Sequence, residues 1–419
     1  MSNTKNELPV GERTDEIVGN HYIAEGRSKT KLTVALLLLP WLAIAGLPII
    51  SALSDISASL NVPENTVKLV ITLPNLSMII SCLLGGVVVG RRLSYKMHII
   101  IPSIIMIVTG TAPFFVNSFT MLLVMRALFG LGIGFLSPLN ADIVFKLYPE
   151  EERAKIIGIS SASMFASSIL YTLLGGYFGG FGWHYVFLIH LIAVVPMIIV
   201  LLLLPNISLD KVDSSKAAVA KEGLWSRLPP KSFYFILVGF VFQMLTFPMV
   251  VNVSFILSEL NIESPATSSI VLTINTITSS IAGLAVGFAV RALRRFVLPL
   301  ALAFSAVGML VASMANGLTP LLVGSGLSGV GSSIMGTAVM LEVAYYVRKE
   351  HIGLFSGVNM AASCIGGFCM TAYTGLLANL GLTSSRSPLL VSAIGVAVML
   401  LGFVAFILIS MRLRNRETA

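Results

Sequence analysis

The residues able to do chemistry in this chain are few, and they lie within apolar stretches. Arg126 opens the segment RALFGLGIGFLSP, and His190 follows the run WHYVFLI. A buried guanidinium can bind an anion or tune a proton carrier, and an imidazole can carry a proton near neutral pH. Arg126 lies about eight residues inside its stretch, roughly 12 Å along a helix. A lipid-facing charge at that depth costs about 3 kcal/mol, so we expect Arg126 to face the protein interior.

Amide and aromatic side chains inside apolar stretches form a second group of candidates. An amide there either ties helices together or contacts a solute, and both alternatives stay open. Asn75 and Asn275 rank highest because they lie 200 residues apart, at corresponding places in two halves of the chain. The predicted binding and coupling residues are Arg126, Asn75, Asn275, Gln243, Asn252, Tyr171, Trp41, Asn359 and His190.

The acidic residues are placed differently. None of the 19 aspartates and glutamates lies deep in an apolar stretch. A carrier of lipophilic cations usually needs a buried carboxylate, which attracts the cation and exchanges it for a proton. The one deep charge here is positive, and this favours an anionic or neutral amphipathic substrate.

The composition explains the elements that position these residues. Hydrophobic residues make up 56% of the 419 residues and charged residues 11%, against about 25% charged in soluble domains. Apolar runs near 20 residues recur along the chain, and each can cross the bilayer as a helix. We therefore expect an all-α membrane protein. Twelve spans are predicted, near residues 33–53, 67–90, 97–116, 119–141, 155–178, 185–204, 232–257, 267–290, 296–315, 318–341, 352–376 and 388–411.

The lysines and arginines predict the orientation of these spans. With the N-terminus in the cytoplasm, all but three of the 27 fall on the cytoplasmic side, the exceptions being Lys68, Arg126 and Arg386. This asymmetry accounts for the net charge of +8 without a nucleic-acid partner. Residues 1–31 have no apolar core of a signal peptide. The predicted organisation is a cytoplasmic tail (1–31), a six-helix half (32–204), a cytoplasmic linker (205–231), a second six-helix half (232–411) and a cytoplasmic tail (412–419).

An internal repeat supports this division. The segments that begin LFGLGIGFL and LSGVGSSIM align at an offset of 199 residues, which pairs Gly130 with Gly329 and Gly132 with Gly331. Pro48 and Pro248 lie at matching places as well. Two pseudo-symmetric six-helix halves around a central cavity are typical of transporters. Gly130 and Gly134 share a helix face and predict close packing there, while Gly132 lies on another face.

Three motifs resemble those of the major facilitator superfamily. RALFGLGIG is similar to the family's Arg-x-x-x-Gly-x-Gly-x-Gly motif in the fourth helix. YPEEERAKIIG (148–158) resembles the entry into the fifth helix, and WHYVF (183–187) the start of the sixth. The resemblance implies the fold of twelve helices in two halves and a coupling role for Arg126. The pattern from span 4 to span 6 looks like the family's efflux branches.

Two motifs depart from the family pattern. GGVVVGRRLSYK (85–96) occupies the place of the charged loop between helices 2 and 3, but it has Gly90 where the family has aspartate. Its basic residues can still form ion pairs with acidic residues at the inner ends of spans 4 and 10. The predicted cytoplasmic gating residues are Arg91, Arg92, Lys96, Asp142, Glu342 and Arg153. The Gly-Pro pair of drug–proton antiporters is replaced by Tyr171 and Thr172, which weakens an assignment to drug export.

These observations predict a secondary transporter of the cytoplasmic membrane rather than an enzyme. The chain has no G-x-x-x-x-G-K-[ST] loop, so we expect no nucleotide cofactor, and no metal ligands are grouped. The leading hypothesis is proton-coupled export of a small organic solute by alternating access, by a monomer in the lipid bilayer. Uptake or facilitated entry of a small organic anion is the alternative, and translocation of a lipid or amphiphile is a third.

Overall fold

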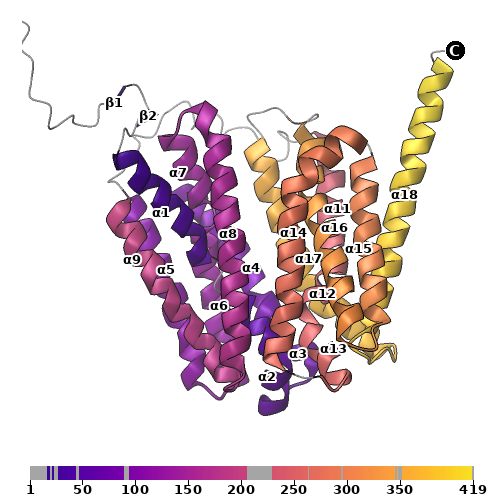
Figure 1. The fold of residues 1–419 in the computed structure, drawn as a ribbon, viewed down its shortest axis with the longest axis horizontal. Coiled ribbons are helices and arrows are strands. Elements are labelled where there is room, and N and C mark those ends of the chain that lie inside the picture. The colour runs from indigo at the N-terminus through magenta and orange to yellow at the C-terminus, as the bar shows by residue number, and fades with distance from the viewer. Residues whose placement is uncertain are drawn as a thin grey trace, which may run out of the picture.

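The computed structural model of this chain is a bundle of long helices (Figure 1). The structure describes residues 17–18, 21–22, 27–43, 47–88, 94–204, 229–262, 264–293, 296–344, 347 and 352–417. Within this part of the chain, the extended elements are β1 (Ile17–Val18) and β2 (His21–Tyr22), which pair antiparallel. The predicted linker lies outside the described residues, except for its last three.

The first six-helix half occupies the chain up to Leu203. Its helices are α1 (Arg27–Ala43), η1 (Leu47–Ala52), α2 (Leu53–Leu60), α3 (Glu64–Val67), α4 (Leu69–Val88), α5 (Tyr95–Thr111), η2 (Ala112–Phe115), α6 (Phe119–Leu136), α7 (Leu139–Leu147), α8 (Glu150–Gly179), η3 (Trp183–Ala193) and α9 (Val194–Leu203). The segments η1, η2 and η3 are 3₁₀-helices.

The second half begins at Pro230. Its helices are α11 (Pro230–Thr246), α12 (Pro248–Val251), α13 (Val253–Glu259), α14 (Pro265–Leu293), α15 (Val297–Ser313), α16 (Leu318–Ala344), α17 (Ile352–Asn379) and α18 (Ser387–Glu417).

The membrane spans agree with the prediction in number and order. Eleven described stretches are long and apolar enough to cross a membrane, and α15 is a shorter apolar helix of 17 residues. The twelve predicted spans in two halves are therefore confirmed. The ends differ, since the first span runs over Lys29–Leu60 and α18 continues to Glu417. Helices extend beyond the hydrocarbon, and hydropathy does not mark where they stop.

Corresponding helices of the two halves are broken at corresponding prolines. Pro48 lies in the 3₁₀ segment η1, and Pro248 begins α12 after the break at Phe247. Proline has no N–H to donate and its ring crowds the preceding turn, which interrupts a regular α-helix. Both breaks lie beside the cavity described below, so the repeat brings irregular backbone from each half to the same place.

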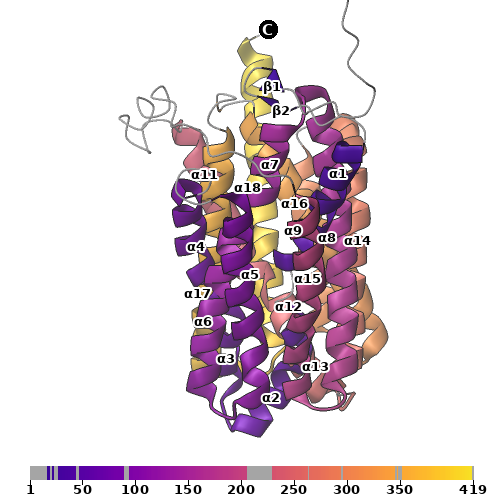
Figure 2. The ribbon, with the colours of Figure 1, turned by 90° about the vertical axis from the view of Figure 1, so that its left-hand side faces the viewer.

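The two halves stand side by side (Figures 1 and 2). The chain's C-terminal helix end and β1 and β2 lie at one end of the bundle, which we call the terminal side. The short helices α2, α3 and α13 lie at the opposite end, the far side. The helices α4, α8, α14 and α17 bring the two halves together, α8 against α14 and α4 against α17.

Close contacts inside each half follow the internal repeat. A Cβ on Gly132 would lie 2.9 Å from the Pro102 carbonyl oxygen, and one on Gly331 would lie 2.6 Å from that of Ala301. These pairs are 199 residues apart, the offset predicted from the sequence. Gly130 also packs against α4, while its counterpart Gly329 packs against α14. The two halves therefore share helix-packing contacts as well as helix order.

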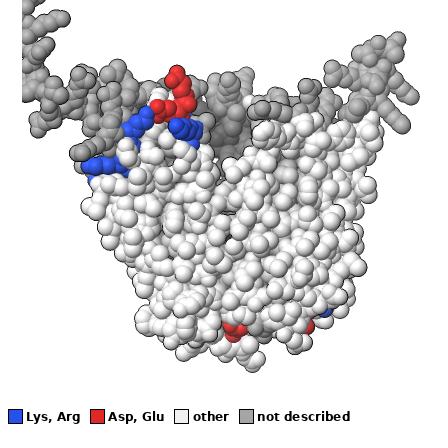
Figure 3. All heavy atoms as spheres, viewed as in Figure 1, with Lys and Arg blue, Asp and Glu red and all other residues white. Residues whose placement is uncertain are grey.

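The outer surface is suited to lipid. Leu202, Leu284 and Phe288 are exposed to 78%, 80% and 75%, which an aqueous protein rarely tolerates in such numbers. On the face shown in Figure 3, the Lys, Arg, Asp and Glu side chains gather at the terminal side, with a few at the far side. The band between them carries no described charge on that face, as a membrane-spanning surface requires.

Candidate functional site

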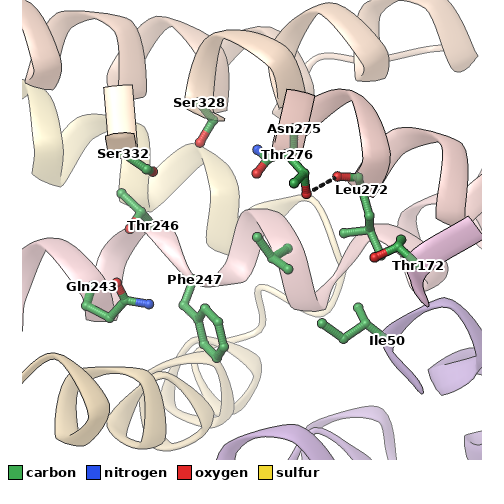
Figure 4. Close-up of a pocket in the computed structure, with 11 residues that line it drawn as sticks. Ile50, Thr172, Gln243, Thr246, Phe247, Leu272, Asn275, Thr276, Ser328 and Ser332 are labelled. Atoms are coloured by element: carbon green, nitrogen blue, oxygen red, sulfur yellow. Dashed lines mark hydrogen bonds between the residues drawn. The ribbon is translucent and has the colours of Figure 1, made fainter. Parts of the chain in front are cut away.

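A cavity of about 240 Å³ lies between the two halves. The first half contributes Ile50 of η1 and Thr172 of α8, and the second half supplies most of the lining from α11, α12, α14 and α16 (Figure 4). The described lining residues are Ile50, Thr172, Gln243, Thr246, Phe247, Val250, Leu272, Asn275, Thr276, Ser328 and Ser332. The cavity therefore belongs chiefly to the second half, with the first half closing one side.

The chemistry of this lining is neutral. Among the residues described around the cavity, the polar groups are hydroxyls and carboxamides, and none is ionisable. Figure 4 shows Asn275, Thr276, Ser328 and Ser332 along one side and Phe247 and Ile50 on the other. The site is therefore amphipathic, as ligand cavities usually are, with a small number of placed polar groups.

Two residues predicted from the sequence, Gln243 and Asn275, line this cavity. The Asn275 Nδ2 also donates to the Ser325 carbonyl of α16 over 2.7 Å. Asn275 thus joins α14 to α16 and also lines the cavity. Of the two alternatives for an amide, the tie between helices is observed, and contact with a solute stays a prediction.

The cavity's hydroxyl groups were not among the residues predicted from the sequence. They are Thr172, Thr246, Thr276, Ser328 and Ser332. A usable signal was present. Ser328 and Ser332 are four residues apart, and Gln243 and Thr246 are three apart, so each pair shares one face of an apolar helix. Such pairs indicate a polar stripe, whereas isolated hydroxyls in membrane helices commonly bond to their own backbone.

Arg126 is buried inside the first half, away from the cavity lining. It is 2% exposed, and its Nε donates to the Val70 carbonyl over 3.0 Å. Its guanidinium carbon lies 4.3 Å from the centre of the Phe129 ring. The prediction that Arg126 faces the interior is confirmed. Its Nη1 has no hydrogen-bond partner among the described residues.

His190 contacts the same phenylalanine. The Phe129 and His190 rings meet edge to face, with centroids 4.9 Å apart. The His190 Nδ1 is 2.8 Å from the Phe187 carbonyl oxygen, and its Nε2 has no described partner. Arg126, Phe129 and His190 therefore form one buried cluster within the first half, between α6 and η3.

The glycines of the Arg126 segment pack as predicted. A Cβ on Gly130 or Gly134 would strike α4, at Pro74 and Met78, whereas one on Gly132 would strike Pro102 of α5. Gly130 and Gly134 thus share one face and Gly132 another. This close packing lets α6 contact α4 and α5 together and holds Arg126 at its depth.

The other predicted site residues are dispersed. Asn75 lies beside Gly367 of α17, at the interface of the halves, and Asn359 packs on Gly239 of α11. Asn252 is fully buried and donates from Nδ2 to the Ser385 carbonyl over 2.9 Å, on the far side.

Two aromatic candidates form a pair inside the first half. Trp41 and Tyr171 meet edge to face, with ring centroids 6.1 Å apart. The Trp41 indole also donates to the Ser163 hydroxyl over 2.9 Å. Trp41 and Tyr171 therefore join α1 to α8, next to the cavity residue Thr172 along the chain.

Charged residues join the two halves on the far side. Lys68 of the first half is 2% exposed, donates to Asn65 over 3.2 Å and lies over the Phe255 ring of the second half. The carboxylates of Glu64 and Glu259 both act on its charge. The Glu64 carboxylate also accepts from the Ser385 hydroxyl over 3.0 Å, across the interface.

The second half holds its side of this far-side cluster in place. Arg386 contacts the Glu259 carboxylate at 3.3 Å and donates to the Ala315 carbonyl over 2.8 Å. Lys68 and Arg386 are the two basic residues that the charge asymmetry left on the far side. Their presence there is explained by this cluster, which fastens the halves together.

Two of the predicted gating residues, Asp142 and Arg153, lie on the terminal side, and each contacts a residue of its own half. Asp142 accepts a short hydrogen bond from the Tyr95 hydroxyl. The Arg153 Nε donates to the Tyr148 carbonyl over 2.9 Å. Burial raises the pKa of the Tyr148 phenol, and its hydroxyl oxygen lies 2.8 Å from that of Thr33.

Burial is described for two of the remaining predicted gating residues. Lys96 is half-buried in α5, and Glu342 is half-buried in α16. Arg91 and Arg92 lie outside the described residues.

Comparison with known proteins bears on this fold and cavity. A family model described as Major Facilitator Superfamily matches residues 34–260, more than half of the chain. A solved bacterial homolog of the human lysosomal transporter Spinster, in an inward-facing and occupied conformation, superposes with a TM-score of 0.72 at 15% identity, over 93% of this chain and 98% of that chain. The nucleoside transporter NupG gives 0.68 at 14% identity, over 90% and 99%. These likenesses establish the fold.

A curated relative is similar over a short stretch. Multidrug resistance protein 3 of Bacillus subtilis (strain 168) is 40% identical over 70 residues, which is 16% of this chain and 14% of that protein. The match spans far less than two thirds of the relative.

Proposed function

From a chain that belongs to the Major Facilitator Superfamily and is a membrane transporter of that type, we propose a more specific activity. In this proposal the protein is a secondary transporter, which moves a small organic solute by alternating access and catalyses no reaction. The solute binds in the cavity between the halves. The halves then rock about it, which exposes the cavity first on one side of the membrane and then on the other.

The observation that supports this proposal is the asymmetry of the interface around the cavity. On the far side the halves are in contact, since Thr72 and Thr371 hydroxyls lie 2.9 Å apart and Glu64 bonds to Ser385. The helices α8 and α14 meet where Gly176 packs on Ser269. Gly158 and Gly287 lie 18 residues from Gly176 and Ser269, on the same helix faces towards the terminal side, and a Cβ on either would meet nothing within 4 Å. A central site sealed at one end is one of the two states that alternating access requires.

The terminal side is proposed to be cytoplasmic, in a cell's cytoplasmic membrane. The distribution of lysine and arginine supports this orientation. The state described here is then inward-open, and the protein acts as a monomer.

The driving force is proposed to be a proton gradient, and the direction export. The lack of a nucleotide-binding loop in the sequence favours an ion gradient over nucleotide hydrolysis as the source of energy. The buried cluster of Arg126 and His190 is the proposed coupling centre, because Phe129 links the two groups at van der Waals distances. The short similarity to a multidrug resistance protein supports export.

The proposed solute is neutral rather than anionic. Arg126, which favoured an anion, is absent from the described cavity lining, and the lining carries no charge. Transferring an anion into such a cavity would leave its charge uncompensated.

Transport by purified protein in proteoliposomes tests the proposal. A pH gradient is imposed in either direction, and neutral, anionic and cationic compounds are compared. We expect gradient-driven movement of neutral compounds, its loss in Gln243→Leu, and loss of gradient dependence in Arg126→Ala. Gly402→Ala, on the exposed face of α18 with nothing within 4 Å, is the control. Transport of no compound above protein-free liposomes, or full activity in Gln243→Leu, would contradict the proposal.

A further inference from the structure

Two hydroxyl groups in the cavity already donate their protons in hydrogen bonds to backbone carbonyls. The Thr246 Oγ1 donates to the Phe242 carbonyl over 2.8 Å. The Thr276 Oγ1 donates to the Leu272 carbonyl over 3.0 Å, the bond drawn in Figure 4. A hydroxyl has one proton and two lone pairs, so each of these threonines can offer a ligand only an acceptor.

The neighbouring groups are adaptable. The Asn275 amide donates one N–H to the Ser325 carbonyl, so its oxygen can still accept and its second N–H can still donate. Gln243, Ser328 and Ser332 are also part of the lining, and each can donate or accept. The fixed requirement of the cavity therefore comes from Thr246 and Thr276, which lie on different helices, α11 and α14.

A ligand that meets this requirement must bring donors. Opposite an acceptor-only oxygen, an ether or carboxylate oxygen leaves both groups unpaired, and an unpaired buried polar group costs binding energy. An ionised ligand faces a second cost, because the described lining has neither a cation for a carboxylate nor an acid for an ammonium group. Phe247, Val250 and Ile50 leave room for an apolar part.

We infer that this cavity selects neutral solutes that carry at least two O–H or N–H donors beside an apolar or aromatic face. The hydroxyl oxygens of Thr246 and Thr276 accept the hydrogen bonds from those donors. This selectivity rests on the proposed function, since it assigns the cavity to the transported solute. It sets the substrate class by hydrogen-bond direction rather than by charge attraction.

A set of probes that share the phenylethane skeleton tests the selectivity. They are 1-phenyl-1,2-ethanediol, its dimethyl ether, mandelate and 2-amino-1-phenylethanol. These present two donors, acceptors alone, a carboxylate and an ammonium group, respectively. Binding to the full-length protein in lipid nanodiscs is measured by thermal shift and by saturation-transfer NMR. We expect the diol to bind about tenfold more tightly than each of the other three.

Variants connect that preference to the two threonines. Thr246→Val and Thr276→Val remove the acceptor at nearly constant volume, and each should weaken diol binding about fivefold while leaving the ether unchanged. Thr246→Ser and Thr276→Ser keep the hydroxyl and should bind the diol like the wild type. Thr109→Val is the matched control, because the Thr109 hydroxyl bonds its own helix in α5 at 2.7 Å, away from the cavity lining.

The outcomes separate this inference from the proposed function. If the diol binds no more tightly than its ether, or if both valine variants bind it like the wild type, the donor preference is overturned. Transport without such a preference contradicts the inference alone. A donor preference without transport of the diol or other neutral donors in proteoliposomes supports the cavity chemistry and contradicts the transport function.

Discussion

The two ends of the interface between the halves differ sharply, although the same helices run through both. On the far side, a Cβ on Gly176 of α8 would lie 2.3 Å from the Ser269 hydroxyl and 2.9 Å from the Ala266 Cα of α14. Gly158 and Gly287 lie on the same faces of these helices, five turns nearer the terminal side than Gly176 and Ser269, and have nothing within 4 Å. The pair α8 and α14 therefore touches at one end and separates towards the other.

The polar contacts show the same difference. Far-side bonds cross between the halves, as from Ser385 to Glu64. On the terminal side, the bond from Lys29 to Glu152 at 2.6 Å stays within the first half. One buried apolar cluster also extends across both halves and includes Leu53 and Ile256. The difference teaches that the far side holds this conformation together, since the bonds from Ser385 to Glu64 and between Thr72 and Thr371 join the halves there.

The largest expected effect comes from locking the far side shut. The Thr72 and Thr371 hydroxyls lie 2.9 Å apart on α4 and α17. Cysteines at both positions, with Cys82, Cys364 and Cys369 replaced by alanine, should form a disulfide that abolishes transport in proteoliposomes. Dithiothreitol should restore it. Undiminished transport by fully cross-linked protein would show that the far side need not open.

The next effect comes from filling the tight contact at Gly176. Overpacking of a closed interface typically costs about 1–3 kcal/mol. Gly176→Leu should therefore disfavour the far-closed state and lower transport about tenfold. The measurement is labelling of a Thr371→Cys reporter by an impermeant maleimide, which should increase. Gly402→Leu, an equal enlargement on the exposed face of α18, should leave both readouts near wild type.

A smaller shift is expected from the far-side charges. Lys68 is 2% exposed and depends on Glu64 and Glu259 for compensation. Glu64→Gln keeps an acceptor for Ser385 but removes one charge, and it should increase Thr371→Cys labelling about three- to tenfold. Glu152→Gln is the control, because its ion pair with Lys29 is well exposed and stays within one half. Equal labelling in both variants would contradict the role assigned to the far-side cluster.

The smallest effect on the balance between the two ends is expected from Arg126→Met. This change removes the bond to Val70 and the stacking on Phe129, both within the first half. It should destabilise the detergent-solubilised protein by about 1–3 kcal/mol, seen as a lower Tm. Thr371→Cys labelling should change less than twofold. An unchanged Tm together with a large change in labelling would contradict this expectation.

Some features of the site could be predicted because they depend on the type and spacing of a few residues. A guanidinium eight residues inside an apolar stretch had to be interior, and Arg126 is. Glycines four apart had to share a face, as Gly130 and Gly134 do against α4. The repeat also placed Pro48 and Pro248 correctly, at equivalent breaks.

The rest depended on how the helices turn toward one another. Asn75 and Asn275 are equivalent in sequence, yet Asn275 lines the cavity and Asn75 faces Gly367 of the other half. The hydroxyls of Thr246 and Thr276 bond to carbonyls four residues earlier in their own helices, as threonines in membrane helices commonly do. A side chain that bonds its own backbone gives no sequence signal of what its remaining lone pairs face.

The sequence by itself determined the membrane environment, the twelve spans, the two related halves and the burial of Arg126, because transfer free energies and helix periodicity act locally along the chain. Only the tertiary structure decided which polar groups share the cavity and which end of it is closed. Those features depend on the rotation and tilt of whole helices, and many weak contacts between distant segments set that rotation and tilt.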